Sequence, residues 1–209
     1  MPRIFKFSDN KIPTPDGVVE IARKLADAAH AAINQKRKWV VPEQPYIVHP
    51  ASVAKALKNA GMSEIVIAAA WLHDTAEDTK LTLEEIESIC GTDVAMLVSE
   101  VTDMSLPEDG NREIRKAMDV KHAAEASFDG QMIKMADMLD NLSSIVEYAP
   151  DFALIWINEK IEMVGVLDKL SKENISTLFV ELNKAKTKAE SFGLNEWLRS
   201  REIMQCRKP

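Results

Sequence analysis

Glycine and cysteine are both scarce in this sequence of 209 residues, which contains seven glycines and two cysteines. The two thiols, Cys90 and Cys206, are too few for a disulfide framework or a thiolate metal centre, so we expect free thiols in a reducing compartment. Residues 1–10 lack the apolar run of a signal peptide, and no stretch is apolar for long enough to cross a bilayer. These absences predict a cytoplasmic protein that does not enter membranes.

Positive charge is also in short supply. The chain has 26 Lys and Arg residues against 33 Asp and Glu residues, which gives a formal net charge of -7. An acidic surface repels nucleic acid and anionic membranes, so we expect neither as a partner. A polyanionic small molecule would have to be bound by a local cluster of positive charge.

Strand-like alternation of apolar and polar residues is hard to find, whereas Ala, Leu, Glu, Lys and Met fill long stretches. The spacing predicts helices over 17–35, 51–60, 64–79, 83–90, 92–103, 111–127, 131–148, 151–170, 173–190 and 194–205. No repeat or Gly/Ser-rich linker divides the chain. We therefore predict an all-α protein with a single globular multi-helix domain, residues 1–209. Its motifs lie within about 17–148, and 149–209 form C-terminal helices that pack on this core.

The segment AAAWLHDTAEDT, residues 68–79, turns abruptly from apolar to ionisable. Four ionisable groups, His73, Asp74, Glu77 and Asp78, occupy six consecutive positions. Three acids this close repel one another, and the dipole at the C-terminal end of a helix adds to their repulsion. A bound cation would explain the arrangement, because it reverses the local electrostatics. The alternative is an acidic helix end that is simply solvated.

A second histidine stands in the segment YIVHP, residues 46–50. His49 is followed by Pro50, which fixes the backbone and can occupy the first turn of a helix. Such a rigid position suits a metal ligand. The alternative is a loop histidine that forms a hydrogen bond with the backbone.

A fourth candidate ligand lies in IKMADMLDN, residues 133–141. Asp137 stands among apolar residues and lies one helical turn before Asn141. A carboxylate buried without a partner is costly, so Asp137 must be satisfied by a metal or by a cation such as Lys134.

These segments together offer two imidazoles and two carboxylates, from His49, His73, Asp74 and Asp137. This mixed set of nitrogen and oxygen donors suits one octahedral divalent ion such as Mn²⁺, with positions left for water, better than a closed structural zinc site. Because the ligands come from separate segments, only the folded chain can bring them together.

The motifs, in this order, resemble the HD-superfamily hydrolase domain of the Rel/Spo homologues. The small, single-domain alarmone hydrolases of the metazoan type are the most similar. The matching pieces are Q-x-R-K (35–38), P-Y-I-x-H-P (45–50), L-H-D-T-x-E-D-T (72–79), T-x-E-E-I and G-x-x-V-x-x-L-V (82–98), E-V-T-D (100–103), N-R-E (111–113) and K-x-A-D-x-x-x-N (134–141). The resemblance extends from about residue 20 to about 147, and no synthetase domain is expected in the remaining residues.

This resemblance implies roles for particular residues. The four candidate ligands would bind Mn²⁺, and Glu77 and Asp78 would be the catalytic acidic pair. Arg37 and Lys38 would approach the nucleotide, and Asn141 would lie near the ribose. The implied reaction removes the 3′-pyrophosphate from guanosine 3′,5′-bis(diphosphate) or its pentaphosphate relative and yields GDP or GTP with pyrophosphate.

The sequence departs from the family after the last ligand. Met138 stands where the family usually has a basic residue, and after Asn141 the chain has Leu142, Ser143 and Ser144 where the family usually has an Arg-Thr or Arg-Asp pair. The loop 39–44 is also longer than expected. Another HD phosphatase activity therefore stays open, on an adenosine analogue of the alarmone, the 2′-phosphate of NADPH or a deoxynucleotide 5′-phosphate. Two further alternatives are a non-catalytic alarmone sensor and an all-α interaction module. The expected partner is a small nucleotide, and homo-oligomerisation is left open.

Overall fold

The computed structural model describes residues 17–37, 40 and 42–205, with side chains up to residue 192. Within these residues the secondary structure is helical apart from one isolated antiparallel bridge between Lys36 and Pro45. The prediction of an all-α fold is therefore confirmed. No helix of the described part is both long and apolar enough to cross a membrane.

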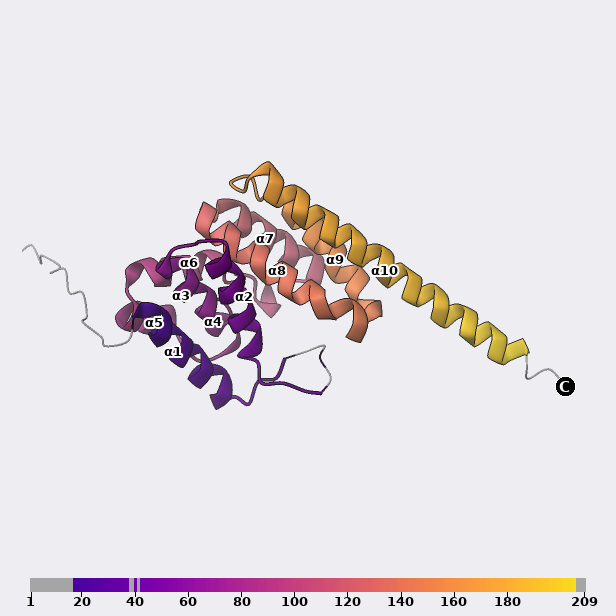
Figure 1. Ribbon diagram of the computed structural model, residues 1–209, viewed down its shortest axis with the longest axis horizontal. Helices are drawn as coiled ribbons and strands as arrows, with labels where there is room; N and C mark the ends of the chain where they lie inside the picture. The colour runs from indigo at the N-terminus through magenta and orange to yellow at the C-terminus, as the bar shows by residue number, and fades with distance from the viewer. Residues whose placement is uncertain (1–16, 38–39, 41, 206–209) are drawn as a thin grey trace, which may run out of the picture.

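The helices follow one another with short connections, and Figure 1 shows α1 to α6 gathered at one end and α7 to α10 at the other. Their bounds are α1 (Val18–Ala32), α2 (Val48–Asn59), α3 (Glu64–Leu72), α4 (Thr75–Asp78), α5 (Leu83–Cys90), α6 (Thr92–Val101), η1 (Pro107–Asp109), α7 (Arg112–Glu125), α8 (Phe128–Tyr148), α9 (Pro150–Val164) and α10 (Lys172–Gln205).

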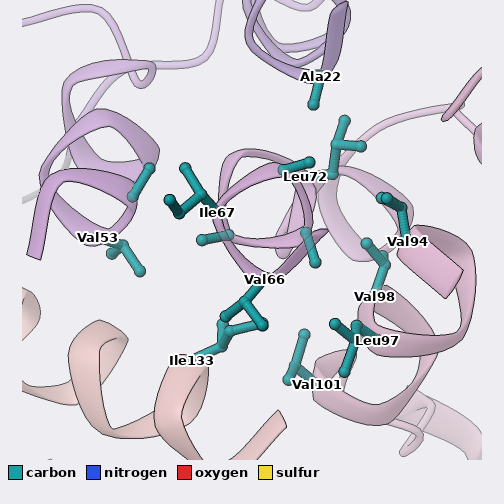
Figure 2. Close-up of a cluster of buried hydrophobic side chains, with 14 of the residues drawn as sticks. Ala22, Val53, Val66, Ile67, Leu72, Val94, Leu97, Val98, Val101 and Ile133 are labelled. Atoms are coloured by element: carbon teal, nitrogen blue, oxygen red, sulfur yellow. The ribbon is translucent and has the colours of Figure 1, made fainter. Parts of the chain in front are cut away.

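The first hydrophobic cluster surrounds α3. The side chain of Ser63 caps this helix, and most of the residues that follow are apolar and buried on all sides. Such a helix must lie inside the molecule rather than on its surface. Figure 2 shows α3 residues Val66, Ile67 and Leu72 encircled by side chains of α1, α2, α6 and α8. The packing fixes the C-terminal end of α3, where the ionisable segment begins.

The second cluster joins the C-terminal part of α8 to α9 and α10. Helix α8 belongs to both clusters, because Ile133 and Ala136 pack in the first whereas Met135 and Met138 pack in the second. A helix clamped on two faces by buried apolar groups is held rigidly. Its remaining face carries Asp137 and is therefore fixed relative to α3.

Several helix boundaries differ from the predictions. The helix predicted over 64–79 is interrupted at His73 and Asp74, so that α3 and α4 are separate. There the His73 Nδ1 donates to the carbonyl of Ala70 and the Thr75 hydroxyl donates to that of Leu72, so side chains satisfy carbonyls that a continuous helix would use. The turn lets His73 and Asp74 point into the same space.

Helix α8 begins earlier than the predicted residue 131, because Gly130 lies inside the helix rather than before it. Ser127 caps the helix, and Glu100 approaches so closely that a Cβ at Gly130 would lie 2.6 Å from its Oε2 atom. The glycine therefore permits a close contact between α6 and α8 instead of ending a helix.

The C-terminal region contains one helix where two were predicted. Helix α10 continues through Gly193 to Gln205 and extends beyond the other helices. A glycine inside a helix costs about 1 kcal/mol, which is too little to end a helix whose other residues favour it. Helix α9 ends earlier than predicted, at Val164.

Candidate metal centre

The fold brings all four sequence-predicted ligands together. His49 lies in the first turn of α2, His73 follows α3, Asp74 precedes α4, and Asp137 stands in the middle of α8. The His49 Nε2 lies 3.2 Å from the Nε2 of His73, 3.4 Å from the Oδ2 of Asp74 and 3.1 Å from the Oδ1 of Asp137. The His73 Nε2 lies 3.1 Å from Asp74 and 3.7 Å from Asp137.

These separations fit a shared cation. An octahedral ion with ligands at about 2.1 Å has neighbouring donor atoms roughly 3 Å apart. Both imidazoles use Nδ1 as a hydrogen-bond donor, His73 to the Ala70 carbonyl and His49 to Asp140, which leaves both Nε2 lone pairs facing the same space. Two lone pairs and two carboxylates at this distance repel unless a cation lies between them. The set therefore fits a divalent metal ion.

The pKa values of the two histidines and two aspartates also indicate a site that favours positive charge. Burial lowers the pKa of His49, but hydrogen bonds with Asp137, Asp140 and Asp74 outweigh it and raise that pKa to about 11. Burial also lowers the pKa of His73, but the charge of Asp74 and hydrogen bonds with Asp137 and Asp74 outweigh it and raise that pKa to about 9. Despite their burial, Asp74 and Asp137 are held ionised by the imidazoles, with pKa values well below the usual range. The site attracts positive charge strongly, and a metal would compete with protons for it.

The acidic pair Glu77 and Asp78 lines the same cleft as three of the ligands, His73, Asp74 and Asp137. Burial and the charges of Asp103, Asp74 and Asp78 raise the pKa of Glu77 to about 7. A carboxyl group with this pKa can hold or release a proton near neutral pH. The cleft thus places an exchangeable proton beside the metal ligands.

Asp78 is anchored by a chain of hydrogen bonds that leads to α1. The Gln35 Nε2 donates to the Asp78 Oδ2 at 2.7 Å, so the amide oxygen of Gln35 faces the buried His30 and accepts from its Nδ1, also at 2.7 Å. The neighbouring Tyr46 hydroxyl donates to the Asp74 Oδ2. Gln35 and Tyr46 stand within the Q-x-R-K and P-Y-I-x-H-P motifs, although the sequence did not reveal these contacts.

The residues expected to bind the nucleotide are placed unequally. Asn141 lines the cleft and donates from Nδ2 to the Asp137 Oδ1 at 2.6 Å. Arg37 also reaches the cleft, but it is buried and pairs with Asp140, 2.8 Å from its Oδ2. Lys38 lies outside the described residues.

Two lysines, Lys134 and Lys160, line the same cleft as the acidic residues. Lys134 pairs with Asp103 at 2.8 Å, not with Asp137 as one sequence alternative supposed. Lys160 of α9 also lines the cleft, with its Nζ 5.4 Å from the ring centre of Trp156. Burial and the charge of Lys134 lower the pKa of Lys160. These lysines are the local positive charge that an anionic ligand of an acidic protein requires.

The sequence and the fold of this chain are similar to those of known proteins. A sequence model described as "HD domain" matches residues 22–153. A guanosine-3′,5′-bis(diphosphate) 3′-pyrophosphohydrolase MESH1 from Danio rerio is 42% identical over 166 residues, which cover 74% of this chain and 89% of that protein. The human protein of that name is 40% identical over 131 residues, 61% of this chain and 71% of its own. A solved structure titled as a metazoan ortholog of SpoT that hydrolyzes ppGpp has a TM-score of 0.66 at 30% identity and covers 82% of this chain and 95% of that one.

Proposed function

This chain belongs to the HD domain family, and we propose that it removes the 3′-pyrophosphate from guanosine 3′,5′-bis(diphosphate) or its pentaphosphate relative. One observation carries the proposal: three of the four donors line one cleft together with the acidic pair and the lysines. The fourth donor, the His49 Nε2, lies within 3.1–3.4 Å of the other three. The relatives named for this reaction match the chain over most of their length. The products would be GDP or GTP with pyrophosphate.

The cofactor we propose is one Mn²⁺ per chain, held by His49, His73, Asp74 and Asp137. Two imidazoles with two carboxylates form a donor set that suits this ion and leaves positions for water. When bound, such an ion acts as a Lewis acid at the phosphoryl group and lowers the pKa of the attacking water.

Glu77 and Asp78 are the proposed catalytic pair. Asp78, held by Gln35, would orient the water, and Glu77 would take its proton, since the Glu77 pKa of about 7 permits both protonation states. In the net reaction the water oxygen forms a bond to the phosphorus attached to the 3′-oxygen of the ribose. The bond between this phosphorus and the 3′-oxygen breaks, and the 3′-oxygen takes up a proton to become a hydroxyl. Pyrophosphate leaves with the added oxygen.

Lys134 and Lys160, which line the cleft, would bind the phosphates. Among the described residues no carboxylate lies within salt-bridge distance of Lys160, so its charge is available to an anionic ligand. Lys134 contributes charge but is shared with Asp103. Asn141 would lie near the ribose and Lys38 would contact the nucleotide, as the family pattern implies. For Arg37 the pattern implies the same contact.

The test is a panel of nucleotides incubated with Mn²⁺-loaded protein, with pyrophosphate and orthophosphate measured separately. We expect pyrophosphate from the guanosine 3′,5′-bis(diphosphate) and GDP as the second product. Orthophosphate from 5′-monophosphates or from the 2′-position of NADPH, with no pyrophosphate from the alarmone, would replace the proposal by another HD phosphatase activity. An adenosine 3′,5′-bis(diphosphate) in the panel measures the preference for the base.

A further inference from the structure

A closed ring of polar contacts connects two of the metal ligands through Arg37. The His49 Nδ1 and the Asp140 Oδ2 are 2.6 Å apart, and the Arg37 Nη2 donates to the same Oδ2 at 2.8 Å. The Arg37 Nη1 donates to the Asn141 Oδ1 at 2.7 Å. Asn141 continues to Asp137, whose Oδ1 lies 3.1 Å from the His49 Nε2 and closes the ring.

The direction of the four hydrogen bonds in this ring is fixed by chemistry. An ionised carboxylate only accepts, so Asp140 makes His49 donate from Nδ1 and keeps its Nε2 lone pair for the metal site. A guanidinium only donates, so Arg37 makes Asn141 accept with its oxygen. The amide nitrogen of Asn141 must then face Asp137. One cation thus sets the orientation of side chains on both sides of the site.

Arg37 is poorly placed to leave this ring for a nucleotide. Its side chain is 6% exposed, and Asp140 is 17% exposed, so water replaces few of their contacts. The backbone is pinned as well, because the Arg37 nitrogen donates to the Gln44 carbonyl at 2.9 Å. Departure of the guanidinium would leave the Asp140 carboxylate largely buried without its cation, which is costly.

We propose that Asp140 and Arg37 are positioning residues for the metal centre, and that Arg37 acts as a strut rather than as a nucleotide ligand. The proposal rests on the metal site of the proposed function but not on the identity of the substrate. Outer partners of ligand histidines typically change metal affinity by about 10- to 100-fold when they are removed. Asp140 and Asn141 both lie on α8, so the ring depends on the same helix that supplies Asp137.

The experiment measures the dissociation constant of Mn²⁺ for the full chain by titration, with free Mn²⁺ detected by electron paramagnetic resonance. Asp140→Ala removes both contacts, and we expect it to weaken binding about 10- to 100-fold. Asp140→Asn keeps an acceptor for His49 but loses the charge that pairs with Arg37, so it should lie between wild type and alanine. Arg37→Met should weaken binding about tenfold, at the lower end of that range.

The matched control is Glu147→Gln, which removes one negative charge from an exposed position on the same helix. We expect its Mn²⁺ affinity to equal that of wild type. Circular dichroism identifies any variant that fails to fold, and Asp140→Asn and Arg37→Met then carry the test. Wild-type affinity in folded Asp140→Ala would overturn the positioning role of Asp140.

Steady-state kinetics distinguish a positioning role of Arg37 from a direct contact with the nucleotide. If Arg37 contacts the nucleotide instead, Arg37→Met raises KM at saturating Mn²⁺ and leaves the Mn²⁺ dissociation constant unchanged, which would overturn the strut. A wild-type chain that binds Mn²⁺ but releases no pyrophosphate would contradict the proposed function alone, because the metal titration needs no substrate.

Discussion

The imidazoles of His49 and His73 show how single side chains define the site. Each uses its Nδ1 for a hydrogen bond within the protein, and the two Nε2 atoms then lie close to Asp74 and Asp137. Glu77 and Asp78 line the cleft with them but belong to a different task. Ligands and catalytic acids should therefore respond differently to substitution.

The first prediction contrasts Asp74 with Glu77. We expect Asp74→Ala to abolish both Mn²⁺ binding and hydrolysis, because it removes a ligand from the centre of the donor set. Glu77→Gln should keep Mn²⁺ binding but lower kcat about 100-fold or more, the usual contribution of a positioned acid or base. Metal titration and steady-state kinetics measure the two effects. Full turnover in Glu77→Gln would remove the proposed role of Glu77.

The second prediction concerns Lys160, which lines the same cleft as the acids. Lys160→Met keeps the approximate length of the side chain but removes the charge, together with the cation–π contact that its Nζ makes with Trp156. We expect the KM for the 3′,5′-bis(diphosphate) to rise about tenfold or more, since a charge-assisted hydrogen bond to phosphate contributes about 1.5–3 kcal/mol. Lys186→Met is the control, because the half-buried Lys186 lies outside the cleft and pairs with Asn158. Unchanged KM in Lys160→Met would exclude phosphate binding there.

Helix α8 is the element on which the site depends most. It supplies Asp137, Asp140 and Asn141 within five positions and is clamped between both hydrophobic clusters. Its beginning is secured by Ser127, whose hydroxyl donates to the Glu100 Oε2 at 2.6 Å and accepts from the Gly130 nitrogen at 3.1 Å. Stability of this element should therefore depend on its cap.

The third prediction tests that cap. Ser127→Ala should lower the free energy of unfolding by roughly 1–2 kcal/mol, because the first-turn nitrogen and Glu100 both lose a partner. Urea denaturation in the absence of added metal measures the loss. Ser143→Ala changes an exposed serine later in the same helix and should shift stability by less than about 0.5 kcal/mol. Equal stability of the two variants would contradict the cap's role.

At the scale of the whole molecule, Asp103 joins helices from both ends. It follows α6 and pairs with Lys134 of α8 at 2.8 Å and with Lys116 of α7 at 2.9 Å. Burial alone would raise the pKa of Asp103, but these two lysines and Lys160 hold it well below the usual range. The folded state therefore prefers the ionised carboxylate more strongly than the unfolded chain does.

The fourth prediction follows from that preference. Because the folded pKa of Asp103 is depressed, its stabilisation is present above the unfolded value of about 4 and is lost as pH falls below it. We expect the free energy of unfolding to fall less steeply between about pH 4 and pH 2 in Asp103→Asn than in wild type. Denaturation of both metal-free proteins across this range gives the two slopes. Parallel slopes would show that Asp103 does not contribute to acid sensitivity.

Much of the fold was predictable because helix formation leaves local signals. The capping box of Thr82 and Glu85 and the apolar segment before His73 both indicated their helices. One error arose where a tertiary contact overrides local preference, because Glu100 fits against Gly130 inside a helix. Another arose because a single glycine costs a helix too little to end it, so α10 continues past Gly193. The single-domain boundary of 1–209 and the assigned roles of site residues stay predictions.

The sequence by itself determined the all-α class, the family and the types of donor at the centre, because each depends on residue identity and near-neighbour spacing. Only the tertiary structure decided which charges meet. Arg37 pairs with Asp140, 103 positions away, and Lys134 pairs with Asp103 rather than with Asp137 on its own helix. Such pairings depend on how helices pack, since the burial that makes an ion pair necessary arises only when distant segments come together.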